Sequence, residues 1–522
     1  MAKLNILGKF CEKGMPMLAG AVDGAGNPDI EQVPAEMRAN FYGRLLTAME
    51  NVGFGYSERL GVLAVGEGDV NAMESVLIES ARWGKEDNEI SEKAAIFATA
   101  IGREHLAREF VDFFEGGERK WDRNMSRSDR LFMIWMHQFR NFSVDVGATE
   151  EDGWKMSIKF PCEMDPCERI NFFNFLDRNP EIRNLITNLH ALNFRDFKPA
   201  ESRAISRMSR LRTLDLDSCD IGNIGAMQHI SKLKGLENLN ISYNPLKERD
   251  LPYLSQMQGL KKLLMSQTIS PYAGFEIMPD GEQLAECVSK LNGLLELDIS
   301  RNEMRSDGAG YISKISGLKK LNIYNNDMRS EGAKHLSRLK ALEVLDISDN
   351  QLDPDAVESL ATLHNLKDLI IGTNYLGDEG ARMISSKFEG LERLDIETNR
   401  LSDSGVIAIS GMQQLIHLDI SRAALGEEGA FQISNMSNLK SLRIACISGG
   451  DLVAKYISKM EGLENLDISN AFLTDEGARY ISQMQGLKTL NVLSNRFTSY
   501  GRNLILSMKK QLSELLIEHS IV

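Results

Sequence analysis

Two cysteines, Cys162 and Cys167, are the residues whose type and spacing come nearest to covalent chemistry. A cysteine thiolate can form a thioester, but it needs electropositive surroundings that stabilise the negative sulfur. The neighbouring side chains here are Glu163, Asp165 and Glu168, which place negative charge beside both thiols. We therefore expect neither cysteine to act as a nucleophile.

Other patterns that carry chemistry are missing from the sequence. It contains no glycine-rich phosphate loop, HExxH or GxSxG motif. His105 and His137 lie in segments with helical periodicity, where a histidine is more often an ordinary residue than a catalytic base. No His or Cys pair stands near Cys162 and Cys167 to complete a zinc site, and the six cysteines are irregularly spaced. We expect free thiols, no cofactor, no metal, and a protein that is not an enzyme.

The overall composition is typical of a folded protein without a membrane span. Apolar residues make up 43% and charged residues 26% of the chain. No run approaches the roughly 18 apolar residues that suggest a membrane helix. The net charge of −14 argues against a nucleic-acid partner, because nucleic-acid binding usually needs a basic footprint. Basic protein partners remain compatible with this charge.

The elements that would position a site come from a repeat that fills the chain from about Ile182 to its end. Its motif, LxxLxIxxN, recurs every 24 or 25 residues, with one spacing of 34. It begins at Leu211, Leu236, Leu260, Leu294, Leu318, Leu342, Leu366, Leu391, Leu415, Leu439, Leu463, Leu487 and Leu512. A second apolar row with the same spacings, from Ile205 to Ile505, lies between successive motifs. This pattern predicts that each unit is a short strand, a turn and a helix whose apolar face covers the strands.

Two recurring features support the turns of this unit. The asparagine that closes the motif can hydrogen-bond backbone groups, so a stack of these residues predicts a ladder. The asparagine stands at positions 244, 302, 326, 350, 374, 399 and 495, and it is replaced by Thr268, Ala423, Ile447 and Ala471. Gly-Ala follows an acidic residue near several expected helix starts, as in Glu379-Gly380-Ala381. We expect these small residues to let the helix approach the strand backbone.

Segments such as LDISRNEMRSDGAGYIS (297–313) and LDISDNQLDPDAVESLA (345–361) resemble ribonuclease-inhibitor-like leucine-rich repeats. The 24-residue length and the phrase EGA resemble the GALA-type repeats of bacterial secreted effectors. The resemblance implies an α/β leucine-rich-repeat solenoid, a horseshoe with a parallel sheet on its concave face and helices on its convex face, in residues 181–522. It also implies a protein-interaction scaffold that binds a protein partner on the concave face. The F-box that GALA-type effectors carry near their start is not found in this sequence.

The N-terminal sequence and the resemblance to secreted effectors both bear on where the protein is located. The N-terminus lacks the long apolar stretch and cleavage site of a standard signal peptide. We expect the protein either to stay in the cytoplasm or to be secreted into a host cell by another route.

Residues 1–180 lack the repeat, and we expect them to form a mainly α-helical N-terminal domain. Helical periodicity is clearest around residues 89–114 and 127–142. Two matches 34 residues apart, at residues 64–68 and 98–102, leave ankyrin-like hairpins as an alternative. If residues 1–180 instead catalyse or recruit, the repeats would be the substrate-recognition half of a ubiquitin-ligase-type effector.

The concave face carries our first candidate binding site. Because strand side chains alternate, the third, fifth, seventh and eighth motif positions point into the groove. The fifth is mostly Asp or Asn, which we interpret as framework rather than as a metal stripe. A recognition patch is predicted where the pattern breaks, and it consists of Arg393, Asp395, His417, Asp419, Arg422 and Arg443. The competing interpretation is that these exposed positions have varied because the repeat tolerates substitutions there.

Aromatic residues supply further candidates. The long unit contains the additional segment SPYAGFEIMP (270–279), and loop insertions in solenoids often lie on the binding face. Its Tyr272 and Phe275 would either contact a partner or fold back and be buried. Tyr243 and Tyr324 stand at groove positions and complete the predicted partner-binding set.

The last residues, LSELLIEHSIV, form a strand motif with no helix after it. A bare strand edge invites pairing, and terminal solenoid units normally need a cap. We expect either a homodimer through this C-terminal strand edge or a short local cap. The final Ser520-Ile521-Val522 also fits a PDZ-ligand pattern.

Overall fold

The computed structural model describes residues 143–149, 153–160, 166–178, 180–194, 197–269 and 279–517. The chain divides into two compact units, Met1–Cys219 and Asp220–Val522. None of the helices in the described ranges is long and apolar enough to cross a membrane. Of the mainly helical domain expected in residues 1–180, residues 1–142 lie outside the described residues.

The first unit combines a β-hairpin with the start of the parallel array. Its elements are β1 (Ser143–Thr149), β2 (Gly153–Lys159), α8 (Pro166–Arg178), α9 (Pro180–Arg183), β3 (Ile186–His190), α10 (Pro199–Ile205) and β4 (Thr213–Asp215). β1 and β2 are antiparallel, whereas β2, β3 and β4 run parallel. The hairpin was not expected, although apolar residues alternate in SVDVGAT and GWKMSIK as they do in half-buried strands. β3 adds a parallel strand before the first predicted motif.

A buried aromatic and ionic cluster forms the core of the first unit. Phe160 packs edge-on against Phe172, with ring centroids 5.1 Å apart. The Arg169 guanidinium lies 4.5 Å above the ring of Phe194 and forms an ion pair with Glu201. Both charged side chains are 1% exposed. This pair joins α8, which contains Arg169, to α10, which contains Glu201. Glu201 also accepts a hydrogen bond from the backbone N–H of Lys198 at 2.5 Å, just before the start of α10.

The second unit is a regular alternation of strands and helices. Its strands are β5 (Asn238–Asn240), β6 (Lys262–Leu264), β7 (Glu296–Asp298), β8 (Lys320–Asn322), β9 (Val344–Asp346), β10 (Asp368–Ile370), β11 (Arg393–Asp395), β12 (His417–Asp419), β13 (Ser441–Arg443), β14 (Asn465–Asp467), β15 (Thr489–Asn491) and β16 (Glu514–Leu516). Its α-helices are α11 (Met227–Ile230), α12 (Leu251–Leu254), α13 (Gly281–Val288), α14 (Arg305–Ile312), α15 (Arg329–Leu336), α16 (Pro354–Leu360), α17 (Gly377–Lys387), α18 (Asp403–Ser410), α19 (Glu427–Ile433), α20 (Gly450–Ile457), α21 (Asp475–Ile481) and α22 (Ser499–Ser507). Short 3₁₀ turns lie at η4 (Glu248–Asp250) and η5 (Met508–Lys510).

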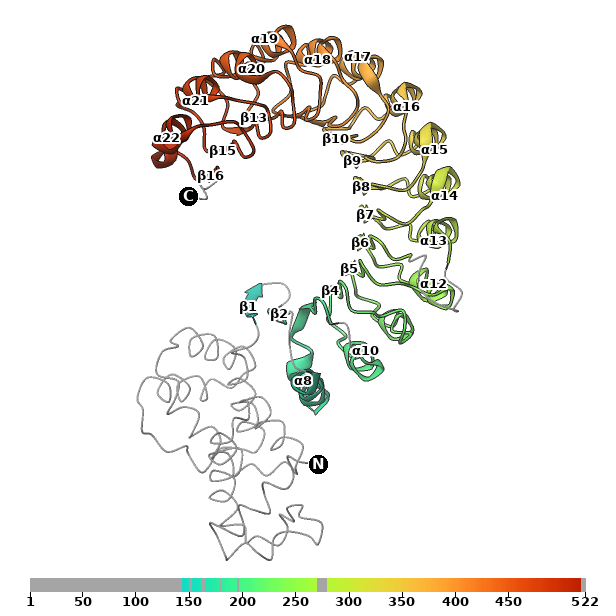
Figure 1. Cartoon of the computed structure of the whole chain (residues 1–522). Coiled ribbons are helices and arrows are strands. Elements are labelled where there is room, and N and C mark those ends of the chain that lie inside the picture. Colours follow the sequence, from blue (N-terminus) through green and yellow to red (C-terminus); the bar gives the residue numbers. More distant parts are fainter. Residues whose placement is uncertain are drawn as a thin grey trace, which may run out of the picture. The chain divides into compact units, whose positions relative to one another are not determined.

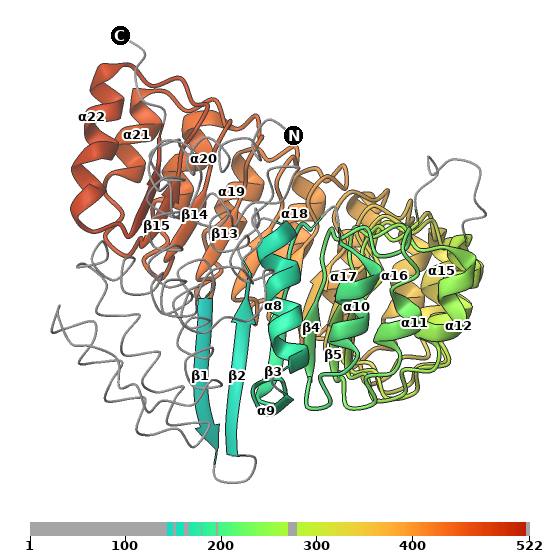
Figure 2. The ribbon, with the colours of Figure 1, turned by 90° about the horizontal axis from the view of Figure 1, so that it is seen from below.

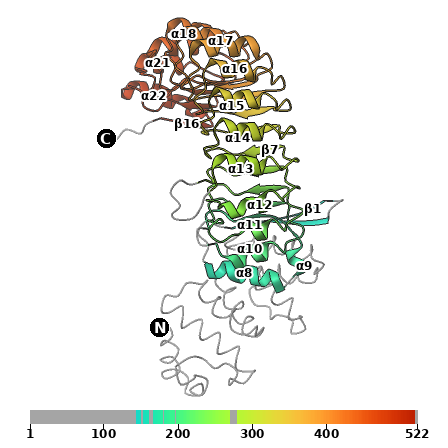
Figure 3. The ribbon, with the colours of Figure 1, turned by 90° about the vertical axis from the view of Figure 1, so that its right-hand side faces the viewer.

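Within this unit the strands pair in sequence order, and the sheet lines the inner side of an arc with the helices outside it (Figure 1). Successive helices such as α12, α13, α14 and α15 stack one above another (Figure 3). The register aligns equal motif positions, so that Leu394 faces Leu418 and Asp395 faces Asp419. The leucine and isoleucine rows are buried, as predicted, with Leu394 and Ile409 at 0% exposure. Each such side chain stabilises the fold by about 1.5–3 kcal/mol.

The predicted asparagine ladder is confirmed. Asn350 Oδ1 accepts the backbone N–H of Asn326 at 3.0 Å, and its Nδ2 donates to the carbonyl of Ile323 at 3.0 Å. One side chain thus ties two consecutive repeats together. Where the ladder stops, Ala423 and Ile447 are buried apolar residues that fill the space without hydrogen bonds from their side chains.

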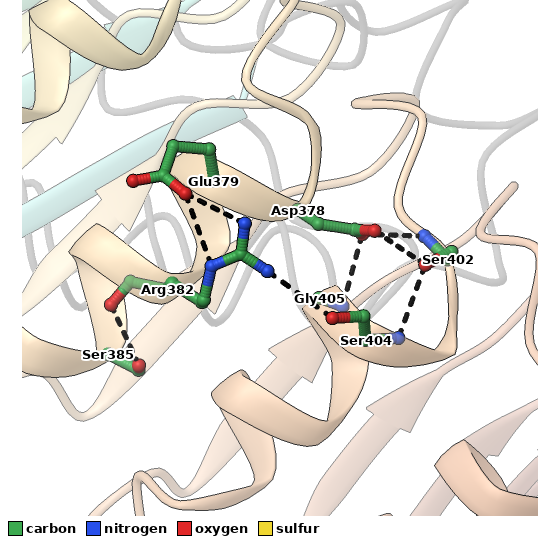
Figure 4. A network of polar contacts seen from close by, with 7 residues as sticks. All are labelled: Asp378, Glu379, Arg382, Ser385, Ser402, Ser404 and Gly405. Atoms are coloured by element: carbon green, nitrogen blue, oxygen red, sulfur yellow. Dashed lines mark hydrogen bonds and ion pairs between the residues drawn. The ribbon is translucent and has the colours of Figure 1, made fainter.

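The starts of the later helices are joined by carboxylates from the preceding repeat (Figure 4). Asp378 Oδ1 accepts the N–H groups of Ser402 at 2.8 Å and Gly405 at 3.0 Å, and Oδ2 accepts the Ser402 hydroxyl at 2.5 Å. Asp451 and Asp475 make the same contacts three and four repeats further on.

This arrangement corrects the expected role of the helix glycines. A Cβ atom added to Gly405 would lie 2.5 Å from Asp378 Oδ1. At Gly332 and Gly380 it would lie 2.6 Å from the Cβ of Met328 and Leu376, four residues earlier. The glycines therefore make room for side chains at the helix start, rather than for the strand backbone.

Candidate functional site

The fifth-position Asp and Asn residues of the strands have a common structural role. One carboxylate or amide oxygen accepts the backbone N–H two residues later, at 3.1 Å from Asp395 to Glu397 and at 3.0 Å from Asn322 to Tyr324. Asp and Asn are interchangeable in this contact because each presents an acceptor oxygen. The contact supports the framework interpretation, and the described residues contain no group of three or more His, Cys, Asp or Glu side chains placed to hold a metal ion.

The predicted recognition patch lies on three neighbouring strands. The register places Arg393 beside His417, and Asp419 between Asp395 and Arg443. Arg443 Nη1 lies 2.9 Å from Asp419 Oδ2, and Arg443 Nε lies 3.6 Å from Asp467 Oδ2 on β14. The Arg443 side chain remains 54% exposed, whereas Asp419 is 7% exposed. Arg443 is therefore an exposed guanidinium held between two carboxylates.

The carboxylate of Asp419 on β12 disturbs the ionisation of Asp395 on β11. Burial and the charge of Asp419 raise the pKa of Asp395 from 3.8 to about 7. Burial and the nearby Arg393 lower the pKa of His417, so this histidine favours its neutral form. Burial lowers the pKa of Arg443, but the negative charges of Asp419 and Asp467 raise it by more. The net effect is a raised pKa, so Arg443 stays cationic.

The remaining predicted residues are more dispersed. Arg422 is exposed in the turn after β12, where its backbone adopts φ of 65°. Tyr243, 47% exposed, and Tyr324 follow β5 and β8, so several strands separate them from the patch. The Tyr324 ring lies below the guanidinium of Arg301, at 5.2 Å. Tyr272 and Phe275 lie outside the described residues.

Next to the patch the sequence analysis missed a hollow of about 230 Å³ on strands β13–β16. Arg443 and Asp467 line one side, and Glu514 and Leu516 line the last strand. A signal was available, since Leu516 occupies a fifth position that is Asp or Asn in most repeats. The depth of the hollow depends on side chains from several strands, so it could not be predicted from the residue at position 516 alone.

Two of the described thiols, Cys219 and Cys287, are buried and are poor nucleophiles. Burial raises the pKa of Cys219 to about 12 and that of Cys287 to about 11, so both are neutral thiols near neutral pH. The side chains of Cys162 and Cys167 lie outside the described part of the chain.

Comparisons with known proteins give one family match and several solved structures of low similarity. Residues 197–448 match the family model described as a leucine-rich repeat region. Among solved structures, an internalin of Listeria monocytogenes is 19% identical, with 56% of this chain and 83% of that one covered and a TM-score of 0.40. A leucine-rich-repeat protein of Leptospira interrogans is 19% identical, with 65% and 91% covered and a TM-score of 0.40. TLR13, solved in complex with ssRNA13, is 19% identical, with 69% and 50% covered and a TM-score of 0.38.

A search among curated proteins finds no match. The family match covers the segment in which the motif, the parallel strands and the alternating helices coincide. These observations together identify residues 197–448 as a leucine-rich-repeat region.

Proposed function

We propose that the protein is an interaction scaffold that binds a folded protein partner on the concave face of β11–β16. The observation that carries this proposal is the departure from the repeat consensus on that face. Arg443 replaces the usual Asp or Asn, stays half-exposed, and borders the hollow. A framework contact needs an acceptor oxygen, which arginine does not have, so its presence is better explained by recognition.

The size of the face fits a protein better than a metabolite. The strands β5–β16 lie side by side at roughly 4.8 Å spacing, which gives a face about 50 Å along its arc. Standard protein–protein interfaces bury about 800 Å² on each partner. The charges of the patch would steer a partner and set its register, and the exposed arginine resembles the anchors that are enriched at interfaces.

The test is site-specific photo-crosslinking in lysate of candidate host cells. A photoreactive residue replaces Ser441 or Thr489 on the concave face, or Glu428 on helix α19 as the convex control. The proposal expects a discrete crosslinked partner from the two concave positions and none from the control. Crosslinks from α19 alone would contradict it.

A second variant tests the recognition patch directly. Arg393→Glu with Arg422→Glu reverses two exposed charges, and we expect the concave crosslink to disappear while the thermal midpoint stays unchanged. Undiminished crosslinking in this variant would place the contact elsewhere on the face.

We further propose that the scaffold acts as a bacterial effector inside a host cell. The 24-residue period and the EGA phrase, which resemble GALA-type repeats, support this role. A reporter-enzyme fusion expressed in the source organism should give a signal in the cytosol of host cells in contact with it. A signal confined to the producing cell would contradict the proposal and would favour a cytoplasmic scaffold.

The rival role, a ubiquitin-ligase-type effector with activity in residues 1–180, finds no support among the described residues. It requires a reactive cysteine, so a ubiquitin-vinyl probe should label the intact protein and fail to label a Cys162→Ala/Cys167→Ala variant. We expect no labelling of either form.

A further inference from the structure

The hollow on the concave face of β13–β16 has a definite size and chemistry. Its volume of about 230 Å³ would hold about seven water molecules, or one long side chain. Strands β13, β14 and β15, whose residues line the hollow, lie side by side (Figure 2). Leu516, 42% exposed, gives the hollow an apolar wall at its outer strand.

The charges around the hollow are mostly negative. Arg443 is already engaged by Asp419 at 2.9 Å and by Asp467 at 3.6 Å. Glu514 is the second carboxylate that lines the hollow, beside Asp467, and within residues 279–517 it forms no ion pair. An anionic ligand would have to displace Asp419 or Asp467 from Arg443, whereas a cationic ligand meets carboxylates directly.

The charge of Asp467 is not required by its structural role. Its Oδ1 accepts the N–H of Ser469 at 3.0 Å and the Ser469 hydroxyl at 2.7 Å. On the next strand the amide oxygen of Asn491 accepts the N–H of Leu493 at 3.1 Å in the same way. An asparagine at residue 467 would therefore serve the turn equally well, and a bound cation would share the negative charge of Asp467 with Arg443.

We propose that this hollow receives a lysine or arginine side chain of the protein partner, an inference that rests on the scaffold function above. The ammonium or guanidinium group lies between Asp467 and Glu514. The aliphatic stem packs on Leu516, as the stems of long basic side chains do on apolar surface. The hollow thus selects partners by a basic anchor residue.

The experiment selects random 12-residue displayed peptides on the intact protein and measures their binding to matched variants. Asp467→Asn with Glu514→Gln removes two charges at the hollow. Glu296→Gln with Asp298→Asn makes the same two changes at the equivalent positions of β7 and is the control. We expect the selected peptides to share a basic residue and to bind the hollow variant about tenfold more weakly, with no change for the control.

A third variant distinguishes loss of the two charges from unfolding of the Asp467→Asn/Glu514→Gln variant, because it is expected to bind more tightly. Asn491→Asp adds a carboxylate to the hollow at a position where aspartate is the commonest residue, and we expect it to bind the same peptides more tightly. Selection of peptides without a basic residue, or equal binding to the hollow variant and the control, would overturn the proposal.

The two proposals fail separately. If the Thr489 crosslink persists in the Asp467→Asn/Glu514→Gln variant at undiminished yield, the face binds a partner but the basic anchor is wrong. If neither concave position gives a crosslink, the scaffold proposal itself fails.

Discussion

At the scale of single residues, an aspartate on the concave face has two separate properties. Its oxygen accepts a hydrogen bond from the turn, and its carboxylate carries a negative charge. The fifth-position oxygen of Asp395 accepts the N–H of Glu397 whether or not the carboxyl is charged. The charge itself is costly there, because Asp395 is half-buried and directly faces Asp419. An asparagine would keep the hydrogen bond and remove the repulsion.

Asp395→Asn should therefore stabilise the protein at alkaline pH. The pKa of Asp395 is 3.8 when unperturbed and about 7 in the fold, so the folded state holds the proton more tightly. The stability that protonation contributes is present in full below about pH 4 and is lost as the pH rises through about 7. At about pH 8 we expect Asp395→Asn to raise the free energy of unfolding by ~1–3 kcal/mol.

Urea unfolding between about pH 5 and about pH 8 measures this difference. The wild type should lose more stability over this range than Asp395→Asn. Asp419→Asn, which removes the neighbouring charge, should move the wild-type transition to lower pH. Parallel stability curves for wild type and Asp395→Asn would contradict the assignment.

At the scale of elements, carboxylates of one repeat complete the helix start of the next. Although partial burial raises the pKa of Asp378, its hydrogen bonds from Ser402 and Gly405 hold that pKa below the usual value. The helix N-terminus offers N–H groups without partners inside the helix, and an acceptor from the preceding repeat satisfies them. Each such contact couples two repeats without adding apolar area.

Asp378→Ala should destabilise the second unit by about 1–2 kcal/mol, because it leaves the N–H groups of Ser402 and Gly405 without this acceptor. Gly405→Ala should act in the same direction, since its Cβ would meet Asp378 Oδ1. The control is Glu379→Ala, which removes only an exposed ion pair with Arg382 and should change stability by less than about 0.5 kcal/mol. Thermal denaturation compares the three, and equal effects of Asp378→Ala and Glu379→Ala would contradict the coupling.

The first unit depends on a different element contact, the buried pair of Arg169 and Glu201. Arg169→Met leaves the Glu201 carboxylate buried without its counter-ion, which should cost about 3–5 kcal/mol. Adding Glu201→Gln removes that charge and should recover part of the loss. Hydrogen exchange of peptides spanning residues 166–205 reports on this unit alone. We expect faster exchange in Arg169→Met than in Arg169→Met/Glu201→Gln. The reverse order would show that the ion pair does not stabilise this unit.

At the scale of the whole molecule, β16 is the last strand of the sheet among the described residues, and its Leu516 is exposed. A strand edge of this kind can pair with an equivalent edge of a second chain. We propose a homodimer through this edge, which would join two concave faces into one longer binding surface. Residues 518–522 lie outside the described part of the chain.

Light scattering after size exclusion tests the dimer. The intact chain should have the mass of a dimer, and Leu516→Lys should have the mass of a monomer, because a lysine on an edge strand opposes pairing. Removal of residues 512–522 should have the same effect. A monomer for the intact chain at all concentrations would rule the dimer out.

The sequence by itself determined the repeat, its strands and helices, the buried leucine rows and the asparagine ladder. These follow from local periodicity, because a residue's place in the motif dictates which side of the strand or helix it occupies. The same periodicity located Asp395 opposite Asp419, since equal positions align in a regular solenoid.

Only the tertiary structure decided the rest. Which carboxylate caps which helix, as Asp378 does for Ser402, depends on side-chain reach between repeats. The Arg169–Glu201 pair joins irregular segments that no repeat aligns, and the hairpin before β3 belongs to no motif. The hollow beside Arg443 exists because exposed side chains of four strands differ in length and direction, and a one-dimensional pattern does not encode depth.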